Sequence, residues 1–331
     1  MISQKNRPRR LRRALAAAAV VTAIAVPTAA AAEAPASVPA PMPAAFSPAD
    51  GPATRYAANR ATITEAARMA DAHGDHGRAS RLRAFADPAR HFLSFDARGG
   101  GRAVEVLGDL PAADRIAVLV PGADTTLDTY DTRGGTPYKT LGGSAAALRD
   151  ELRRQDPAAR VAVVAWLGYA TPGTVSPEVL TTGRADEAAR ELRAFTGSLH
   201  RINKNAAISL LGHSYGSVVC GRAASGLAVA DIALYGSPGT GADSAAALHT
   251  PGRVWAGRGT DDWVGGVPHT SAHLFGTTVG FGADPVSPAF GARVFAAGDG
   301  GHSEYHKPGS LPLRNLARIA LGKEPVERSH G

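Results

Sequence analysis

The feature that most constrains this chain is a short apolar run, Ala207 to Leu211, that leads into Gly212-His213-Ser214-Tyr215-Gly216 and then into a helical pattern. A serine hydroxyl is a weak nucleophile unless the chain holds it beside a base and donors for an oxyanion. A tight turn from strand to helix does this, but it leaves little room two residues to either side, which suits Gly212 and Gly216. This order predicts a nucleophile elbow at Ser214, with an ordinary strand-to-helix turn as the alternative.

The first 32 residues have the pattern of a secretory signal peptide. Six basic residues precede an apolar run from Ala14 to Val26, and small residues at 30–32 suit cleavage before Glu33. The run is short for a bilayer span, and no later stretch is long enough. We therefore expect a secreted protein, or one held in the cell envelope, with no integral membrane segment after signal removal. The pair Arg9-Arg10 leaves a twin-arginine export route open, and a retained anchor is the other alternative.

The composition argues against a nucleic-acid-binding protein and against one stabilised by disulfides. The chain has 36 Lys and Arg against 29 Asp and Glu, but residues 1–32 contain six basic and no acidic residues. The remainder has 30 basic and 29 acidic residues, so we expect no nucleic acid partner. Cys220 is the only cysteine, which excludes an intramolecular disulfide. Stability must come from a core, and the chain is long enough to bury one as a single domain.

Alternating patterns along the chain predict its fold class. Residues 33–50 are rich in Ala and Pro and are predicted as a disordered leader, and 51–90 as an N-terminal helical segment. Residues 91–325 follow as one domain in which strands and helices alternate. Strands are expected at 92–96, 103–107, 115–120, 161–166, 207–211, 232–235, 253–256 and 293–297, and later helices at 142–155, 184–202, 215–228, 242–248 and 310–321. This order is typical of an α/β fold with a mostly parallel, doubly wound sheet and helices on both faces.

A nucleophilic Ser214 requires an acid and then a histidine from loops after later strands. The strand at 253–256 continues into a glycine-containing turn with two adjacent carboxylates, Asp261 and Asp262. Asp261 is preferred because of its spacing to Val264. Either carboxylate has the alternative of a solvated loop position or the cap of a short helix.

The histidine is expected after the strand at 293–297, where flexible glycines precede His302. Those glycines allow a loop to reach across the carboxyl edge of the sheet to the serine. His306 is the competing base, but it leads into the last helix. A metal site formed by His302, Glu304 and His306 is not expected, because ligands at this spacing need a helix to hold them on one side.

An oxyanion hole needs two N–H donors aimed at the developing charge. One is expected to be the amide of Tyr215, directly after the nucleophile. The other is expected in the turn after the strand at 115–120, where the amide of Ala123 follows Pro121-Gly122. Asp124 either orients a substrate group or caps the following turn.

These residues resemble the α/β-hydrolase superfamily, and more closely a family of secreted actinobacterial α/β-hydrolases whose substrate has not been assigned. The resemblance extends from about residue 90 to 322. It rests on Gly212–Ser217, Gly236–Gly239, Asp284–Pro288 and Gly301–Tyr305, together with Trp166–Tyr169 and Thr171–Gly173. It implies a triad of Ser214, Asp261 and His302, in agreement with the reasoning from the residues. It departs at Pro121, where many esterases have histidine, so the resemblance leaves the second oxyanion donor open.

The expected function is therefore a secreted serine hydrolase that cleaves carboxylic esters through an acyl-enzyme, without a cofactor. Insertions at 167–183 and 263–291 are placed to cover the site. Apolar residues in the second favour a small-molecule or lipid-like acyl ester, unless they pack on the core instead: Leu274, Phe275, Val279, Phe281 and Phe290. A peptidase or amidase, an acyl transferase and a non-catalytic cell-envelope binding protein are the alternatives.

Overall fold

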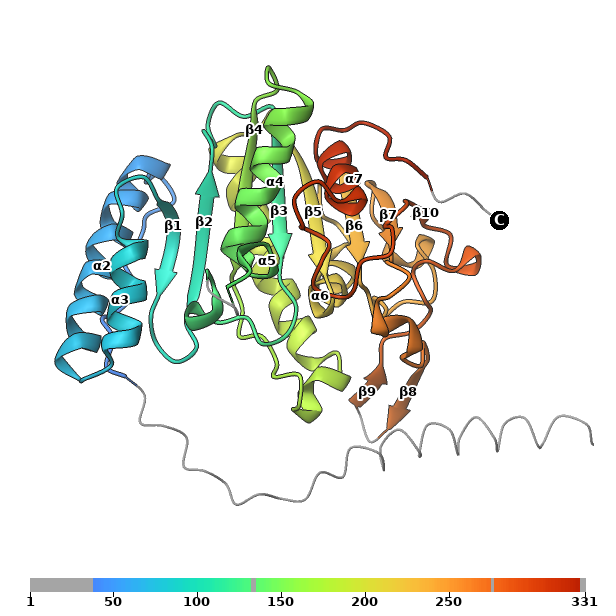
Figure 1. The fold of residues 1–331 in the computed structure, drawn as a ribbon, viewed down its shortest axis with the longest axis horizontal. Helices are drawn as coiled ribbons and strands as arrows, with labels where there is room; N and C mark the ends of the chain where they lie inside the picture. The colour runs from blue at the N-terminus through green and yellow to red at the C-terminus, as the bar shows by residue number, and fades with distance from the viewer. Residues whose placement is uncertain (1–37, 132–134, 275–276, 328–331) are drawn as a thin grey trace, which may run out of the picture. The chain divides into compact units, whose positions relative to one another are not determined.

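The computed structural model describes residues 38–131, 135–274 and 277–327. Its main feature is an eight-stranded sheet in the order β1-β2-β4-β3-β5-β6-β7-β10 (Figure 1). β1 (His91–Asp96) pairs antiparallel with β2 (Arg102–Leu107), which pairs antiparallel with β4 (Val161–Leu167). The other strands run parallel: β3 (Arg115–Val120), β5 (Ala207–His213), β6 (Asp231–Tyr235), β7 (Arg253–Gly257) and β10 (Arg293–Val294). This is the mostly parallel sheet that the sequence predicts.

Helices cover both faces of this sheet (Figure 1). One face packs against α4 (Leu141–Gln155) and α7 (Leu311–Ala320), and the other against α5 (Gly183–Ile202) and α6 (Tyr215–Ala223). In β3, Leu119 belongs to the first apolar cluster and Val118 to the second. Because successive side chains of a strand point to opposite faces, a strand buried on both sides needs an unbroken apolar run. The fold is that of the α/β hydrolases, as expected.

The N-terminal helical segment consists of α2 (Pro52–Ala72) and α3 (His76–Phe85). The break between them contains Gly74, whose φ of 87° favours a residue without a side chain. Ile63 and Leu82 lie in the same buried cluster as α4 and α7. The helical segment and the sheet therefore share one core.

The expected leader and signal peptide are only partly within the described residues. Residues 38–50 contain neither helix nor strand, but Val38 and Ala40 pack against the buried cluster beside α4 and α7. Val38 and Ala40 therefore contact the fold, and the disorder expected over 33–50 stays a prediction. The signal peptide over 1–32 lies outside the described residues. No helix within the described ranges combines the length and the apolar character needed to cross a bilayer.

The structure differs from the sequence pattern in the second half of the chain. α6 ends at Ala223 rather than at 228, and Gly226 beyond it has a φ of 77° that a continuing helix excludes. The helix expected at 242–248 is a single 3-10 turn, η4 (Ala246–Leu248). The insertion at 263–291 contains a hairpin of two strands that the pattern did not indicate, β8 (Ser271–Leu274) and β9 (Thr277–Gly280).

Candidate active site

Ser214 lies at a sharp turn between β5 and α6, as expected for a nucleophile elbow. Its φ of 51° and ψ of −126° form a conformation that residues with a side chain rarely adopt. A Cβ on Gly212 would come within 2.8 Å of the Gly216 carbonyl oxygen, and a Cβ on Gly216 would overlap the carbonyl oxygens of Val120 and Pro121. Both glycines are therefore required, Gly212 because the start of α6 lies against it and Gly216 because the turn lies against the end of β3.

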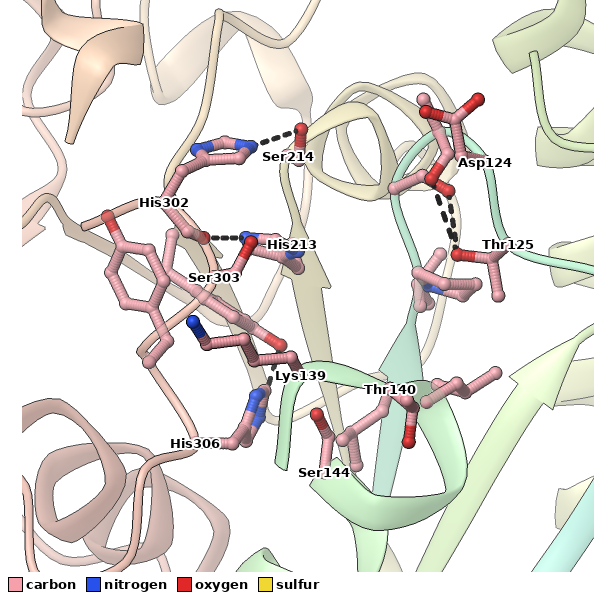
Figure 2. Close-up of a pocket in the computed structure, with 18 of the residues that line it drawn as sticks. Asp124, Thr125, Lys139, Thr140, Ser144, His213, Ser214, His302, Ser303 and His306 are labelled. Carbon is pink, nitrogen blue, oxygen red and sulfur yellow. Dashed lines mark hydrogen bonds between the residues drawn. The ribbon is translucent and has the colours of Figure 1, made fainter. Parts of the chain in front are cut away.

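The hydroxyl of Ser214 faces an imidazole. His302 Nε2 lies 2.9 Å from Ser214 Oγ, and His302 Nδ1 lies 2.8 Å from Oδ1 of Asp262; Figure 2 shows the first of these contacts. His302 comes from the loop between β10 and α7, and Asp262 from the loop after β7, so all three side chains meet at the carboxyl edge of the sheet. An imidazole bound to a carboxylate at Nδ1 presents Nε2 to the serine as a proton acceptor.

The carboxylate beside His302 is that of Asp262 and not that of Asp261, which corrects the choice made from the sequence. Asp262 is 5% exposed, and its Oδ1 also accepts a hydrogen bond of 2.9 Å from the amide of Val264, capping a short 3-10 helix. The backbone turns between Gly259 and Asp262, and this turn leaves Asp261 on the exposed side. The spacing of Asp261 to Val264 was therefore the wrong criterion, because the carboxylate that binds the Val264 amide is that of Asp262, two residues before it.

Tyr305 completes the surroundings of Asp262, a role that the sequence pattern did not indicate. Its hydroxyl donates to Asp262 Oδ2 at 2.5 Å and accepts from the amide of Gly259 at 3.2 Å. Burial alone would raise the pKa of Asp262, but the hydrogen bonds from His302 and Tyr305 outweigh it and hold this pKa below its usual value. Burial raises the pKa of Tyr305 and keeps it a neutral donor. A buried tyrosine three residues after the base needs a partner for its hydroxyl, and that need is the signal for this contact.

We expect Tyr305→Phe to lower the free energy of unfolding at pH 7 by about 1–2 kcal/mol, because a buried carboxylate loses a hydrogen bond. The pKa of Asp262 is lower in the folded than in the unfolded chain. Its contribution to stability is therefore present above the unfolded value, near 4, and is lost as the pH falls through the folded value. The difference between variant and wild type should shrink in urea titrations at pH 3.

A matched control for this substitution is Tyr56→Phe in α2. The Tyr56 hydroxyl is buried and has no hydrogen-bond partner among the described residues. Its removal is expected to cost little stability at either pH. Equal losses at pH 7 and pH 3 for Tyr305→Phe would contradict the role assigned to its hydroxyl.

His213 and His306 are two further histidines enclosed around the site. Burial, with a smaller effect of the neighbouring His302, lowers the pKa of His213 to about 3, and burial lowers that of His306 to about 4. His213 Nε2 donates to the backbone carbonyl of His302 at 2.8 Å. His306 Nε2 lies 3.4 Å from the Tyr235 hydroxyl, so the competing base of the sequence analysis faces Tyr235 rather than the serine. Both rings are uncharged at neutral pH.

The two residues expected to provide oxyanion donors lie on either side of Ser214. Tyr215 is the first residue of α6, where an amide has no acceptor within its own helix. Ala123 lies in the loop after β3 and lines the same pocket as Ser214. This loop approaches the serine so closely that a Cβ on Gly122 would lie 2.8 Å from Ser214 Cβ. Their function as oxyanion donors stays a prediction.

The loop that contains Ala123 is held by contacts with residues 169–174. The Tyr169 hydroxyl donates to the carbonyl of Pro121 at 2.7 Å. The Asp124 carboxylate accepts hydrogen bonds from the amide of Thr174, at 3.0 Å, and from its hydroxyl. Asp124 thus connects the loop after β3 to the insertion after β4.

A pocket of about 180 Å³ opens beside Ser214 and is lined largely by residues with polar side chains (Figure 2). From the insertion at 263–291 it receives Trp263, which is 60% exposed and whose ring centroid lies 4.7 Å from that of His302. Phe281 and Phe290 are buried in the cluster beside α5 and α6 instead. For these two residues the structure therefore shows the second of the expected alternatives, packing on the core rather than on the pocket. Phe275 and the side chain of Leu274 lie outside the described residues.

Comparison with known proteins identifies relatives by sequence. A sequence model of the family described as "Alpha/beta hydrolase" matches residues 96–272. An uncharacterized protein of Mycobacterium tuberculosis is 32% identical over 260 residues, which cover 70% of this chain and 39% of that protein. An uncharacterized protein of Mycobacterium bovis is 32% identical over 207 residues, which cover 58% of this chain and 76% of that protein. The chain thus spans less than half the length of the first of these relatives.

A solved structure with a similar fold is XC6422 from Xanthomonas campestris, described as an α/β serine hydrolase without a lid. It aligns with a TM-score of 0.42 and 17% sequence identity. The alignment covers 71% of this chain and 94% of that one.

Proposed function

Because the chain belongs to the α/β-hydrolase family, we propose that it is a serine hydrolase that cleaves carboxylic esters. One observation supports this most: Ser214 Oγ, His302 and the buried Asp262 form a chain of contacts of 2.9 and 2.8 Å at the edge of a pocket. A serine in a strained turn, an imidazole beside its hydroxyl and a carboxylate at the far nitrogen of that imidazole are the groups that acyl transfer requires.

In the proposed first half-reaction, His302 Nε2 takes the proton of Ser214 as Oγ attacks the acyl carbon. The carbonyl oxygen becomes an oxyanion that the amides of Tyr215 and Ala123 stabilise. When the intermediate collapses, the bond to the alcohol breaks and His302 returns the proton to the departing oxygen. Asp262 stabilises the imidazolium between these two steps.

The second half-reaction uses the same groups on water. His302 removes a proton from a water molecule, whose oxygen attacks the acyl-enzyme at the acyl carbon. The new intermediate collapses, the bond to Ser214 Oγ breaks, and His302 returns the proton to the serine. A carboxylic acid leaves, and the site is restored.

The test uses the purified protein, a fluorophosphonate and a series of p-nitrophenyl esters. We expect an intact-mass increase of one adduct on Ser214 and turnover of the esters. Adduct formation together with cleavage of peptides but not of esters would favour the peptidase or amidase alternative. A folded protein with neither adduct nor turnover would overturn the proposal in favour of a non-catalytic binding protein.

We also propose that residues 1–32 direct export and are then removed. The basic start, the apolar run and the small residues before Glu33 support this. Amino-terminal sequencing of the protein released by an expressing bacterium is expected to begin at Glu33. A full-length chain that stays with the cells would contradict export.

A further inference from the structure

The pocket beside Ser214 has an uneven distribution of charge. Among the described residues that line it, Asp124 has a carboxylate and Lys139 an ammonium. Asp124 accepts two hydrogen bonds from Thr174. The ammonium of Lys139 lies over the ring of Tyr138, 6.0 Å from its centroid, and forms no ion pair with a described carboxylate. The lining histidines His213 and His306 are uncharged at neutral pH because burial lowers their pKa values to about 3 and about 4.

We propose that Lys139 forms an anion subsite of this pocket, and that the substrate is an ester with a carboxylate or another anionic group near the scissile bond. The inference rests on the proposed function, because it concerns the substrate of the same serine. Lys139 is an exposed residue that lines this pocket, and an ammonium attracts an anion that lies within a few ångströms of it. A site that binds such a group loses binding free energy when the substrate lacks it.

The backbone of Lys139 belongs to a hydrogen-bonded turn. It ends the 3-10 helix η2 (Pro137–Lys139), and its amide donates to the carbonyl of Thr136 at 3.1 Å. The Thr140 hydroxyl donates to the carbonyl of Pro137 at 2.7 Å. Figure 2 shows the side chain of Lys139 extended across the pocket toward the segment that contains His302 and His306. These contacts fix the backbone from which the exposed Lys139 side chain reaches the pocket.

The neighbouring helix end adds to the positive potential. α4 starts directly after Thr140, and Thr140, Leu141 and Ser144 line the pocket together with Lys139. The amino-terminal end of a helix has a partial positive charge. An anion beside Lys139 would thus interact with a full charge and with the dipole of a fifteen-residue helix.

The pocket has a mixed wall, in which Leu119, Leu141 and Val179 lie beside residues with polar side chains. The phenylalanines of the insertion at 263–291 that the structure describes, Phe281 and Phe290, are buried in the core. Side chains with hydroxyl groups take their place on the walls, among them Tyr138, Ser144 and Ser303. Such a mixed lining accommodates an ester that has a polar group as well as an apolar part.

The experiment compares two esters with the same six-carbon acyl chain, mono-p-nitrophenyl adipate and p-nitrophenyl hexanoate. Only the first has a terminal carboxylate. A second pair puts the charge on the alcohol: 3-carboxyphenyl hexanoate and its uncharged methyl ester.

The measurement is kcat/KM for each ester with wild type, Lys139→Met and the matched control Lys204→Met. Initial rates are corrected for hydrolysis without enzyme. Lys204 is an exposed lysine in the loop between α5 and β5, at the opposite edge of the sheet.

For at least one pair, we expect wild type and Lys204→Met to prefer the charged ester. Lys139→Met should lower the ratio of charged to uncharged kcat/KM by about tenfold, which corresponds to about 1.4 kcal/mol. The preference should also weaken as the salt concentration rises. The ester pair whose ratio falls in Lys139→Met shows whether the anionic group belongs to the acyl part or to the alcohol part of the substrate. Equal ratios in wild type and Lys139→Met for both pairs would overturn the proposal.

A binding measurement separates failure of the subsite from failure of the proposed function. Trp263 lines the pocket, so titration with adipate is followed by tryptophan fluorescence in wild type, Ser214→Ala and Lys139→Met. Saturable binding that persists in Ser214→Ala and weakens about tenfold in Lys139→Met supports the subsite even if no ester is cleaved. If esters are cleaved but adipate binds equally well to wild type and Lys139→Met, the proposed hydrolase function is retained and the proposed subsite is overturned.

Discussion

Ser214→Ala is expected to lower ester turnover by a factor on the order of 10⁴ or more while the protein stays folded. The substitution removes the only atom that attacks the acyl carbon, Oγ, which lies 2.9 Å from His302 Nε2. The residual rate would come from the oxyanion donors and from substrate binding. The measurement is kcat on a p-nitrophenyl ester, with circular dichroism and thermal unfolding to show that the fold is retained.

The control for this result is Ser198→Ala. Ser198 lies in α5, where its hydroxyl donates to the carbonyl of Phe195 at 2.6 Å, away from the pocket. This variant should have kcat close to that of wild type. Retention of more than about a tenth of the wild-type kcat by a clean preparation of Ser214→Ala would exclude the acyl-enzyme mechanism, since loss of a triad serine costs far more.

Asp262→Asn is expected to lower kcat by a factor on the order of 10³–10⁴. The carboxamide accepts a hydrogen bond from His302 Nδ1 less well than the carboxylate and does not stabilise the imidazolium. It also favours the imidazole tautomer in which Nε2 has the hydrogen, and this nitrogen then has no lone pair for the proton of Ser214. Rates are measured over pH 5–9, so that a shifted profile is not mistaken for a loss of activity.

Asp261→Asn is the matched control, because it makes the same chemical change one residue away. Asp261 is exposed and has no contact with His302 among the described hydrogen bonds. We expect its kcat to stay within about threefold of wild type, as for an ordinary surface substitution. A large loss from Asp261→Asn with a small loss from Asp262→Asn would restore the choice made from the sequence.

The residues of the elbow and the histidine were predictable because local chemistry specifies them. Gly212, Ser214 and Gly216 follow from the steric demands of a turn that no other residue types satisfy as well. His302 follows from a strand, a glycine-rich loop and the chain order that this sheet imposes. The structure brings Ser214 and His302 into contact.

The acid was not predictable with the same certainty, because Asp261 and Asp262 are adjacent in an irregular turn. Which of them points inward is decided by two distant partners, the Tyr305 hydroxyl and the imidazole of His302. No periodicity in the sequence reports those contacts. The positions of Phe281 and Phe290 were unpredictable for a similar reason. Apolar residues of an insertion pack on the pocket or on the core according to where the insertion folds back, and these two pack on the core.

His213 provides a second connection between the nucleophile and the base, in addition to the contact between the side chains of Ser214 and His302. It directly precedes Ser214 and donates from its ring to the carbonyl of His302. The loop with the base is therefore fastened directly to the strand that positions the nucleophile. Insertions, deletions or a new pocket wall in the part of the 263–291 segment beyond Val264 leave this contact in place. Selection can then change the substrate preference of this chain while Ser214 and His302 stay together.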